Sequence, residues 1–208
     1  TLPGGLMPRM ALGYLVFPVL TVLAGAGLEV ATPAEVAEAV DRITELAVEL
    51  APARPASGNE AKRLALAIGA RLPAVYGGPT TGAVAYRWKT DLNENAKAFA
   101  LAAALPEMNH NEIEAWQGAA ARGMQAVLLR ERDEPPAIAR RFAVLTDLIG
   151  ATAGGVVEHW TSGKGRLARL LATAYVGQWT SYYLALLREV DPWPVPRLDA
   201  LKRRMAEP

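Results

Sequence analysis

Short apolar runs alternate with helical segments from Leu72 onward, and this alternation most limits what the chain can fold into. The runs have the length and composition of strands and cover residues 72–78, 98–103, 124–131 and 154–163. The segments between them carry the spacing of amphipathic helices. Strands and helices that alternate in this way predict βαβ units, and therefore a parallel sheet with helices packed on it. We expect an α/β fold.

The first 71 residues have the pattern of helices that pack on this domain. An N-cap threonine, a first-position proline and a capping-box acid occur together at residues 32–35, so a helix should begin there and run to about Leu50. A second helix should occupy residues 59–71. We therefore divide the chain into a helical segment, residues 1–71, and an α/β domain, residues 72–208, that form a single compact unit.

The stretch from Met10 to Leu28 contains no charged residue. Its length is that of a transmembrane helix or a signal peptide. Pro18 and a Gly/Ala-rich end weaken a continuous span, and Arg9 is the only basic residue before it. A helix that is buried on all sides has the same composition, and we prefer that interpretation. Such a helix needs a covering surface.

The chain ends in two helices of different character. Residues 165–190 are apolar on nearly all sides, broken only by Gly177, so this helix should be central in the core. Three prolines in residues 191–196 end it, and a basic amphipathic helix follows. Four cations lie on this helix: Arg197, Lys202, Arg203 and Arg204. A cluster of this kind is also typical of a surface that binds nucleic acid or a membrane. The net charge of +1 argues against such partners, so a solvated face is the preferred interpretation.

The chain has no cysteine, which excludes structural disulfides, thiolate catalysis and cysteine-based zinc sites. This composition fits a reducing cytoplasm. The two histidines, His110 and His159, are isolated and lack ligand spacing such as HExxH, so we expect no metal.

Residues 86–116 form the most polar stretch of the chain, and we place the chemistry there. Its polar side chains include Asn93, Glu94, Asn95, Lys97, Glu107, Asn109, His110, Asn111 and Glu112. An imidazole beside carboxylates suits proton transfer. Asn109 or Asn111 can equally serve as the N-cap of a following helix, so capping and catalysis both stay open.

The GGPTTG turn at residues 77–82 follows the first strand and leads into a helix. Backbone N–H groups at such a turn can receive an anion or substrate hydroxyls. The glycines are weak evidence by themselves, because strand-to-helix turns need glycine without any ligand.

Five segments in one order carry a resemblance to a known family. YRWKTDLNENAK and PEMNHNEIEAW resemble the second sugar-isomerase (SIS) domain of the bifunctional phosphoglucose/phosphomannose isomerases. PGGLMPRMALGY, RLPAVYGG and the C-terminal region from GRLARLL to DALKRR also resemble that family. The resemblance implies a SIS-type three-layer αβα domain with N-terminal and C-terminal packing helices. It also implies that the apolar N-terminal helix packs against a partner domain or subunit. The family's first SIS domain, which holds the sugar phosphate, is not found before Thr1.

The resemblance assigns roles in an aldose–ketose isomerisation through an enediolate. Glu94 matches the general base that moves the proton between C1 and C2; otherwise it is a helix carboxylate paired with Lys97. His110 matches the ring-opening histidine, which in this family comes from the neighbouring subunit and so implies a homodimer. Otherwise His110 is a loop histidine held by Glu107 or Glu112.

Two cations complete the catalytic set that the resemblance implies. Arg9 matches the arginine near the enediolate, where a guanidinium stabilises negative oxygen and binds substrate. Lys202 matches a C-terminal lysine that assists ring opening; otherwise it belongs to a solvated helix face. The further substrate-binding residues that we expect are Gly77, Gly78 and Thr80.

The implied substrates are glucose 6-phosphate and fructose 6-phosphate, in cytoplasmic glycolysis and gluconeogenesis, with no cofactor. The resemblance implies mannose 6-phosphate less directly, because the loop here has Val195 or Trp193 in the neighbourhood where family members have a threonine. The alternative is a noncatalytic sugar-phosphate-binding or regulatory SIS domain.

Overall fold

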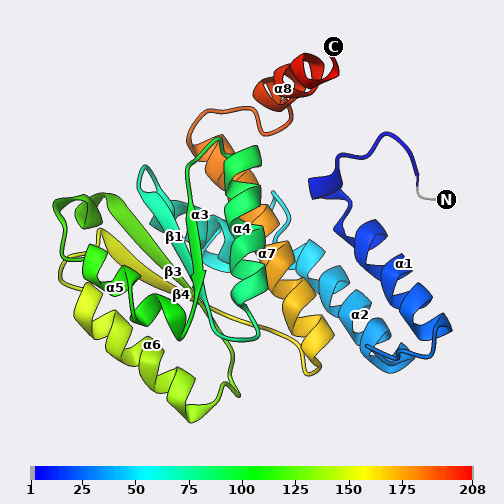
Figure 1. Cartoon of the computed structure of the whole chain (residues 1–208), viewed down its shortest axis with the longest axis horizontal. Coiled ribbons are helices and arrows are strands. Elements are labelled where there is room, and N and C mark those ends of the chain that lie inside the picture. The colour runs from blue at the N-terminus through cyan, green and yellow to red at the C-terminus, as the bar shows by residue number, and fades with distance from the viewer. Residues whose placement is uncertain (1–2, 208) are drawn as a thin grey trace.

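The computed structural model describes residues 3–207 and has a four-stranded parallel sheet at its centre (Figure 1). The strand order is β2-β1-β3-β4. Val75 of β1 lies opposite Val127 of β3 and Ala102 of β2, so the strands are in register across the sheet. The strands are β1 (Leu72–Gly77), β2 (Leu101–Ala104), β3 (Met124–Arg130) and β4 (Gly155–Trp160). The predicted α/β class with a parallel sheet is confirmed.

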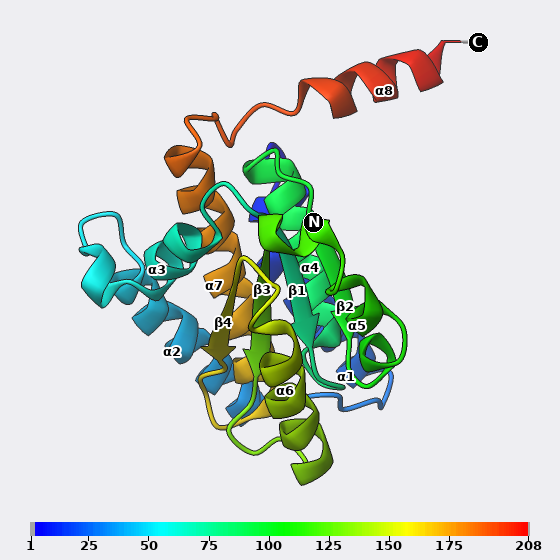
Figure 2. The same ribbon diagram turned by 90° about the vertical axis from the view of Figure 1, so that its left-hand side faces the viewer.

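Helices cover both faces of the sheet, as Figures 1 and 2 show. The α-helices are α1 (Leu12–Gly25), α2 (Pro33–Glu49), α3 (Glu60–Ile68), α4 (Gly82–Asn95), α5 (Glu112–Ala115), α6 (Pro136–Ile149), α7 (Arg166–Leu187) and α8 (Pro196–Ala206). Short 3-10 helices occur at η1 (Pro8–Met10), η2 (Ala56–Gly58), η3 (Glu107–Asn109) and η4 (Ala119–Gly123).

Alternate strand residues supply two cores, which makes the domain a three-layer αβα sandwich. Val75 and Val127 face the core shared with α2, α3, α4 and α7. Tyr76 and Leu128 face the opposite core, built with α5 and α6. This separation follows from the two-residue period of a strand. The long helix α7 lies at the centre of the first core, as its all-round apolar sequence predicted.

The helix signals in the sequence correspond to the observed termini. Thr32 and Glu35 form the predicted capping box of α2, and Pro33 is its first residue. Asn59 caps α3 by accepting from the backbone N–H of Lys62. α3 ends at Ile68, three residues before the expected Arg71, because Gly69 at φ 53° turns the chain. The division of the chain at residue 71 stays a prediction.

The second strand begins later than predicted, at Leu101 instead of Ala98. Lys97 has a positive φ of 51° and ends α4, with the Ala98 N–H donating to the Leu92 carbonyl. The Asn93 side chain donates to the Ala98 carbonyl at 2.7 Å. These bonds hold residues 98–100 in the helix-to-strand connection. The fourth strand likewise ends at Trp160 instead of running to residue 163.

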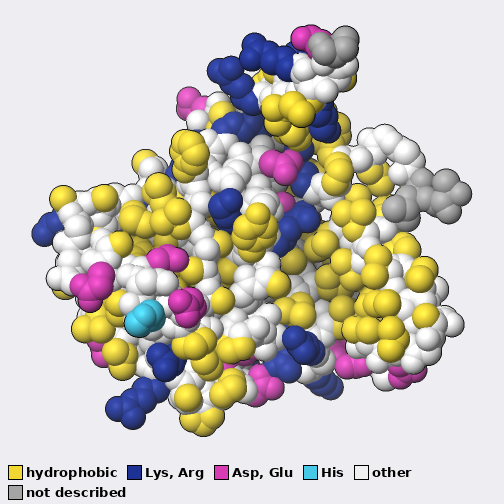
Figure 3. Space-filling model, in the orientation of Figure 1, with side chains coloured by type: hydrophobic (Ala, Val, Ile, Leu, Met, Phe, Trp, Pro, Cys, Tyr) yellow, Lys and Arg dark blue, Asp and Glu magenta, His cyan; other side chains and the backbone are white. Residues whose placement is uncertain are grey.

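The apolar N-terminal stretch forms α1, but α1 is not buried on all sides. None of its residues is fully buried, and Val22 is 71% exposed. Figure 3 shows apolar side chains over this part of the surface. Leu12 and Phe17 pack against a small cluster that α2 and α7 share. Within residues 3–207, no helix has the length and apolarity needed to cross a bilayer.

The last helix, α8, projects from the body of the domain (Figure 2). Leu201 and Met205 on α8 are 57% and 78% exposed. The predicted basic helix is therefore present, with an apolar side that the described residues leave open.

Candidate active site

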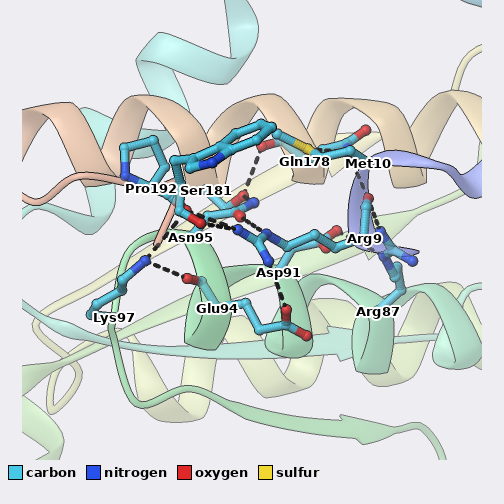
Figure 4. A network of polar contacts seen from close by, with 11 residues as sticks. Arg9, Met10, Arg87, Asp91, Glu94, Asn95, Lys97, Gln178, Ser181 and Pro192 are labelled. Atoms are coloured by element: carbon cyan, nitrogen blue, oxygen red, sulfur yellow. Dashed lines mark hydrogen bonds and ion pairs between the residues drawn. The ribbon is translucent and has the colours of Figure 1, made fainter. Parts of the chain in front are cut away.

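Arg9 lies at the centre of a polar network at one end of α4 (Figure 4). Its side chain is buried although it belongs to the N-terminal segment. Nε donates to Asn95 Oδ1 at 2.8 Å, and Nη1 donates to Glu94 Oε2 at 3.2 Å. Nη2 donates to the carbonyls of Trp193 and Pro192 at 2.7 and 3.1 Å. The guanidinium thereby joins the N-terminus, α4 and the connection between α7 and α8.

The backbone of Arg9 is held as firmly as its side chain. Its carbonyl accepts from Arg87 Nη2 at 2.6 Å and from Gln178 Nε2 at 2.7 Å. The amide of Asn95 is also fixed, because its Nδ2 donates to Ser181 Oγ at 2.8 Å. α4 and α7 thus set the direction in which the guanidinium points.

Glu94 lies in the last turn of α4, and its side chain is 41% exposed. Its Oε2 pairs with Arg9, and its Oε1 has no hydrogen-bond partner within residues 3–207. Lys97 Nζ donates to the backbone carbonyl of Glu94 at 2.8 Å, not to its carboxylate. The carboxylate is therefore paired with Arg9 instead of with Lys97, and one oxygen is free to accept a proton.

A groove of about 650 Å³ opens beside Glu94. It lies between the end of α4, residues 98–100 and the beginning of α8. Three cations line it with Glu94: Lys89, Lys97 and Arg197. The groove is large enough for a small ligand, and its charges favour an anionic one.

Lys202 lies on α8 beyond the residues that line this groove. It is exposed and has no polar partner in the described part of the chain. Leu198, one helical turn earlier, does line the groove. The structure therefore brings Arg9 and Glu94 together, and it places Lys202 on the neighbouring helix without contact to either.

His110 is exposed and lies near the opposite edge of the sheet from Glu94. It follows β2 and η3, so it is at the carboxyl edge, whereas Glu94 ends the antiparallel return helix α4 at the amino edge. α4 has 14 residues and is about 20 Å long. Within one chain, His110 and Glu94 are therefore separated by roughly the length of this helix.

Local hydrogen bonds around His110 explain the capping pattern of the sequence. Asn111 caps α5 by accepting from the Glu112 N–H at 2.6 Å, and its Nδ2 donates to Glu107 Oε1 at 3.4 Å. Tyr76 donates to the Glu112 carboxylate at 3.1 Å. Neither acid binds the His110 ring, so the capping interpretation holds for Asn111 and leaves His110 free.

The predicted glycine turn also lies at the carboxyl edge. A Cβ at Gly77 would lie 2.5 Å from the Thr81 carbonyl carbon, so the turn requires glycine for packing alone. Thr81, not Thr80, closes it: Thr81 Oγ1 accepts from the Gly78 N–H and donates to the Leu129 carbonyl. Gly77, Gly78 and Thr80 are therefore not brought to Glu94 within one chain, and their binding role stays a prediction.

Asp91 and Arg87 were missed by our sequence reasoning, although both lie in the polar stretch. Asp91 is 1% exposed and accepts from Arg87 Nε at 2.9 Å. Burial raises the pKa of Asp91 to about 6, and the Arg87 guanidinium opposes this shift. The signal in the sequence was the four-residue spacing of Arg87, Asp91 and Asn95, which places them on one helix face.

No group of three or more His, Asp or Glu side chains within residues 3–207 has the arrangement of a metal site. The network above contains guanidinium, carboxylate, amide and hydroxyl groups, which serve proton transfer and oxyanion stabilisation.

Comparisons with known proteins show which proteins this chain resembles. Residues 57–205 match the model of the bacterial phospho-glucose isomerase C-terminal SIS domain. The chain is 36% identical over 210 residues to a bifunctional phosphoglucose/phosphomannose isomerase of Caldicellulosiruptor bescii, covering 100% of this chain and 62% of that protein. It is 31% identical over 209 residues to the Aquifex aeolicus protein of the same name, covering 98% and 60%. The chain thus spans about three-fifths of the length of these relatives.

Solved structures show the same fold. A glucose-6-phosphate isomerase like protein from Thermus thermophilus has a TM-score of 0.73 and 25% identity, and the match covers 98% of this chain and 66% of that one. A glucosamine-6-phosphate deaminase from Thermotoga maritima has a TM-score of 0.62 at 14% identity, with coverage of 90% and 54%, which supports the fold alone.

Proposed function

Because the chain belongs to the bacterial phospho-glucose isomerase C-terminal SIS domain family, we propose that it supplies the proton-transfer half of a hexose-phosphate isomerase site. The substrates are glucose 6-phosphate and fructose 6-phosphate, and mannose 6-phosphate is the second aldose. The observation that carries the proposal is the Arg9 guanidinium 3.2 Å from a half-exposed Glu94 carboxylate beside an open groove.

Glu94 has the properties of the base for the carbon-bound proton. Its Oε1 is free, and its side chain is 41% exposed, so a ligand in the groove can reach it. The carboxylate removes the proton from C2 of the open-chain aldose and returns it to C1, and the reverse reaction exchanges these positions. One group therefore serves both half-reactions as base and then as acid.

Arg9 stabilises the enediolate that forms between these proton transfers. A guanidinium has five N–H donors, and four hydrogen bonds of Arg9 go to protein groups. The second N–H of Nη1 is left for a substrate oxygen. Because protein contacts fix the guanidinium in advance, it does not reorganise as negative charge develops.

We propose that a second copy of the chain supplies the ring-opening histidine. Glu94 and the exposed His110 lie near opposite edges of the sheet, so a homodimer that places these edges together completes the site. Lys202 assists ring opening from α8. Gly77, Gly78 and Thr80 contact substrate at the carboxyl edge in the same arrangement. The exposed residues of α1 and α8 offer apolar surface for such contacts.

The phosphate site belongs, in this proposal, to the part of the relatives that the chain does not match. A cytoplasmic location and a place in glycolysis and gluconeogenesis complete the proposal. The lack of cysteine supports a reducing compartment.

The second candidate is a sugar-phosphate-binding domain without turnover. The separation of Glu94 from His110 and from the glycine turn favours it, because one chain alone does not assemble the full set. The groove beside Glu94 serves either function.

A coupled isomerase assay with fructose 6-phosphate separates the two candidates. It should be run on the chain alone and on the chain joined to the part of the Caldicellulosiruptor bescii relative that it does not match, with the mass in solution measured in parallel. Turnover that Glu94→Gln removes supports the isomerase. Saturable binding of fructose 6-phosphate by an oligomer that shows no turnover in either form supports the binding domain.

A further inference from the structure

Asp91 is a buried carboxylate that the proposed chemistry does not use. It lies on α4 one turn before Asn95 and is 1% exposed. Its Oδ2 accepts from Arg87 Nε at 2.9 Å, whereas its Oδ1 is buried without a partner in the described chain. Burying a carboxylate with one unsatisfied oxygen is unfavourable, so its presence here needs a reason.

Arg87 connects Asp91 to the backbone of Arg9. The Nε of Arg87 binds the carboxylate, and its Nη2 donates to the Arg9 carbonyl at 2.6 Å. The two bonds use the fixed fork of one guanidinium, so the direction of the second depends on the first. Figure 4 shows these groups beside the Arg9 guanidinium.

Arg9 depends on such bonds because little packing holds its segment. η1 is three residues long, and α1, which follows it, has no fully buried residue. The Arg9 carbonyl has two donors, Arg87 from α4 and Gln178 from α7. Apart from the packing of Leu12 and Phe17 on one side of α1, polar contacts therefore fix the site's cation.

We propose that Asp91 is a positioning residue which, through Arg87, holds Arg9 in place beside Glu94. The proposal rests on the proposed function for its catalytic consequence, but its structural part concerns Arg9 alone. Without the carboxylate, Arg87 loses its anchor and the Arg9 carbonyl loses one of its two donors. The guanidinium then samples positions away from the groove.

Buried ion pairs contribute little net stability, so a stability role does not account for this arrangement. A second buried pair with the same four-residue separation, but outside any helix, provides the comparison. Arg130 and Glu134 are four residues apart and pair directly, with side chains 9% and 6% exposed. Arg130 ends β3 and Glu134 lies in the connection to α6, at the carboxyl edge of the sheet and away from the Glu94 of the same chain.

The test compares Asp91→Asn and Arg87→Lys with the matched control Glu134→Gln. The first measurement is the hydrogen-exchange rate of the Arg9 Nε–H by ¹⁵N NMR in the folded chain. We expect exchange to be at least about fivefold faster in Asp91→Asn and Arg87→Lys, because the hydrogen bond from Arg9 Nε to Asn95 Oδ1 opens more often. The exchange rate should be unchanged in the control. If Asp91→Asn does not fold, Arg87→Lys decides, since Arg87 is partly exposed.

The second measurement is kcat and KM for fructose 6-phosphate in the form that shows turnover. We expect kcat to fall about tenfold with KM nearly constant. Displacing the guanidinium raises the free energy of the transition state more than that of the bound substrate. The control should keep the wild-type kcat.

Unchanged Arg9 exchange in folded Asp91→Asn and Arg87→Lys would overturn the proposal even if the chain is an isomerase. A fall in kcat of the same size in the control Glu134→Gln would overturn the proposal as well, because the loss of any buried ion pair would then be enough to slow turnover. Faster Arg9 exchange without turnover in any form supports the positioning role while the proposed function fails.

Discussion

The Arg9 guanidinium lies 3.2 Å from the Glu94 carboxylate, although 85 positions separate the two residues in the chain. The contact brings the segment before α1 onto the last turn of α4. Nη2 of the same guanidinium holds the carbonyls of Pro192 and Trp193, so the approach to α8 is tied to the same point. A single side chain thus connects the N-terminal segment with α4 and with the approach to α8, and residues of the latter two line the groove beside Glu94.

Glu94→Gln tests the base directly. The amide keeps the shape of the side chain but does not accept a proton, so we expect kcat for fructose 6-phosphate to fall at least about a thousandfold. Binding of the sugar phosphate should change little. The free energy of unfolding should fall by less than about 1 kcal/mol, because the ion pair with Arg9 is partly exposed. A coupled assay, calorimetric binding and urea unfolding measure the three quantities.

Glu49→Gln is the matched control for this variant. Glu49 also ends a helix, is 50% exposed and pairs with an arginine, Arg42. It should leave kcat unchanged. A Glu94→Gln protein with wild-type turnover would remove Glu94 from the mechanism.

Asp91 should make stability depend on pH in an unusual direction. Its pKa is about 6 in the folded chain and 3.8 ordinarily, so the folded state binds its proton first as the pH falls. The stability that Asp91 contributes to the folded state is therefore complete below its ordinary pKa of 3.8, and it is lost as the pH rises through about 6. The facing charges are Arg87, Glu94 and Arg9.

We expect the wild type to gain on the order of 1–2 kcal/mol relative to Asp91→Asn between about pH 7 and about pH 5. Urea unfolding of both proteins across this range measures the difference. A difference that is constant with pH, or that grows towards neutral pH, would contradict the raised pKa.

Gly177 should tolerate no side chain, although it lies within α7. A Cβ there would overlap the Trp88 indole, which is fully buried and donates to the Thr173 carbonyl at 2.9 Å. We expect Gly177→Ala to lower the free energy of unfolding by at least about 3 kcal/mol in urea titrations.

Gly25→Ala provides the comparison for this substitution. Gly25 is also helical, in α1, and a Cβ at this position meets no atom within 4 Å. It should change the free energy of unfolding by no more than about 1 kcal/mol. Equal effects of the two substitutions would show that α7 can move away from Trp88.

The elements of the fold could be predicted wherever a local signal marks them. The capping box of Thr32 and Glu35 fixes the beginning of α2, and the apolar run from Leu72 fixes β1. The first residue of β2 could not be predicted from local sequence signals. It depends on the left-handed conformation of Lys97, a residue with no intrinsic preference for that region.

The site was less accessible to sequence reasoning than the fold. Periodicity contains no information that Arg9 reaches Glu94, and only the family resemblance joined them. The Asp91–Arg87 pair had a visible four-residue spacing, but nothing local distinguishes such a pair on a surface from one that is 1% exposed. Burial is decided by α7 and η1, which arrive from distant parts of the chain.

His110→Ala should leave stability unchanged, because His110 is exposed and has no hydrogen bond within residues 3–207. If it opens the sugar ring, turnover of the cyclic substrate should fall about a hundredfold and that of an open-chain analogue much less. Equal slowing of both substrates would argue against ring opening.

Mixing two inactive variants tests whether His110 acts across subunits. In a dimer of one Glu94→Gln chain and one His110→Ala chain, one site keeps an intact Glu94 and an intact His110 from different chains. Random exchange should therefore restore about one quarter of the wild-type turnover. If both residues served the site of their own chain, every site in the mixture would lack one of them, and turnover would stay at the level of the separate variants even when mass measurements show that the chains have exchanged.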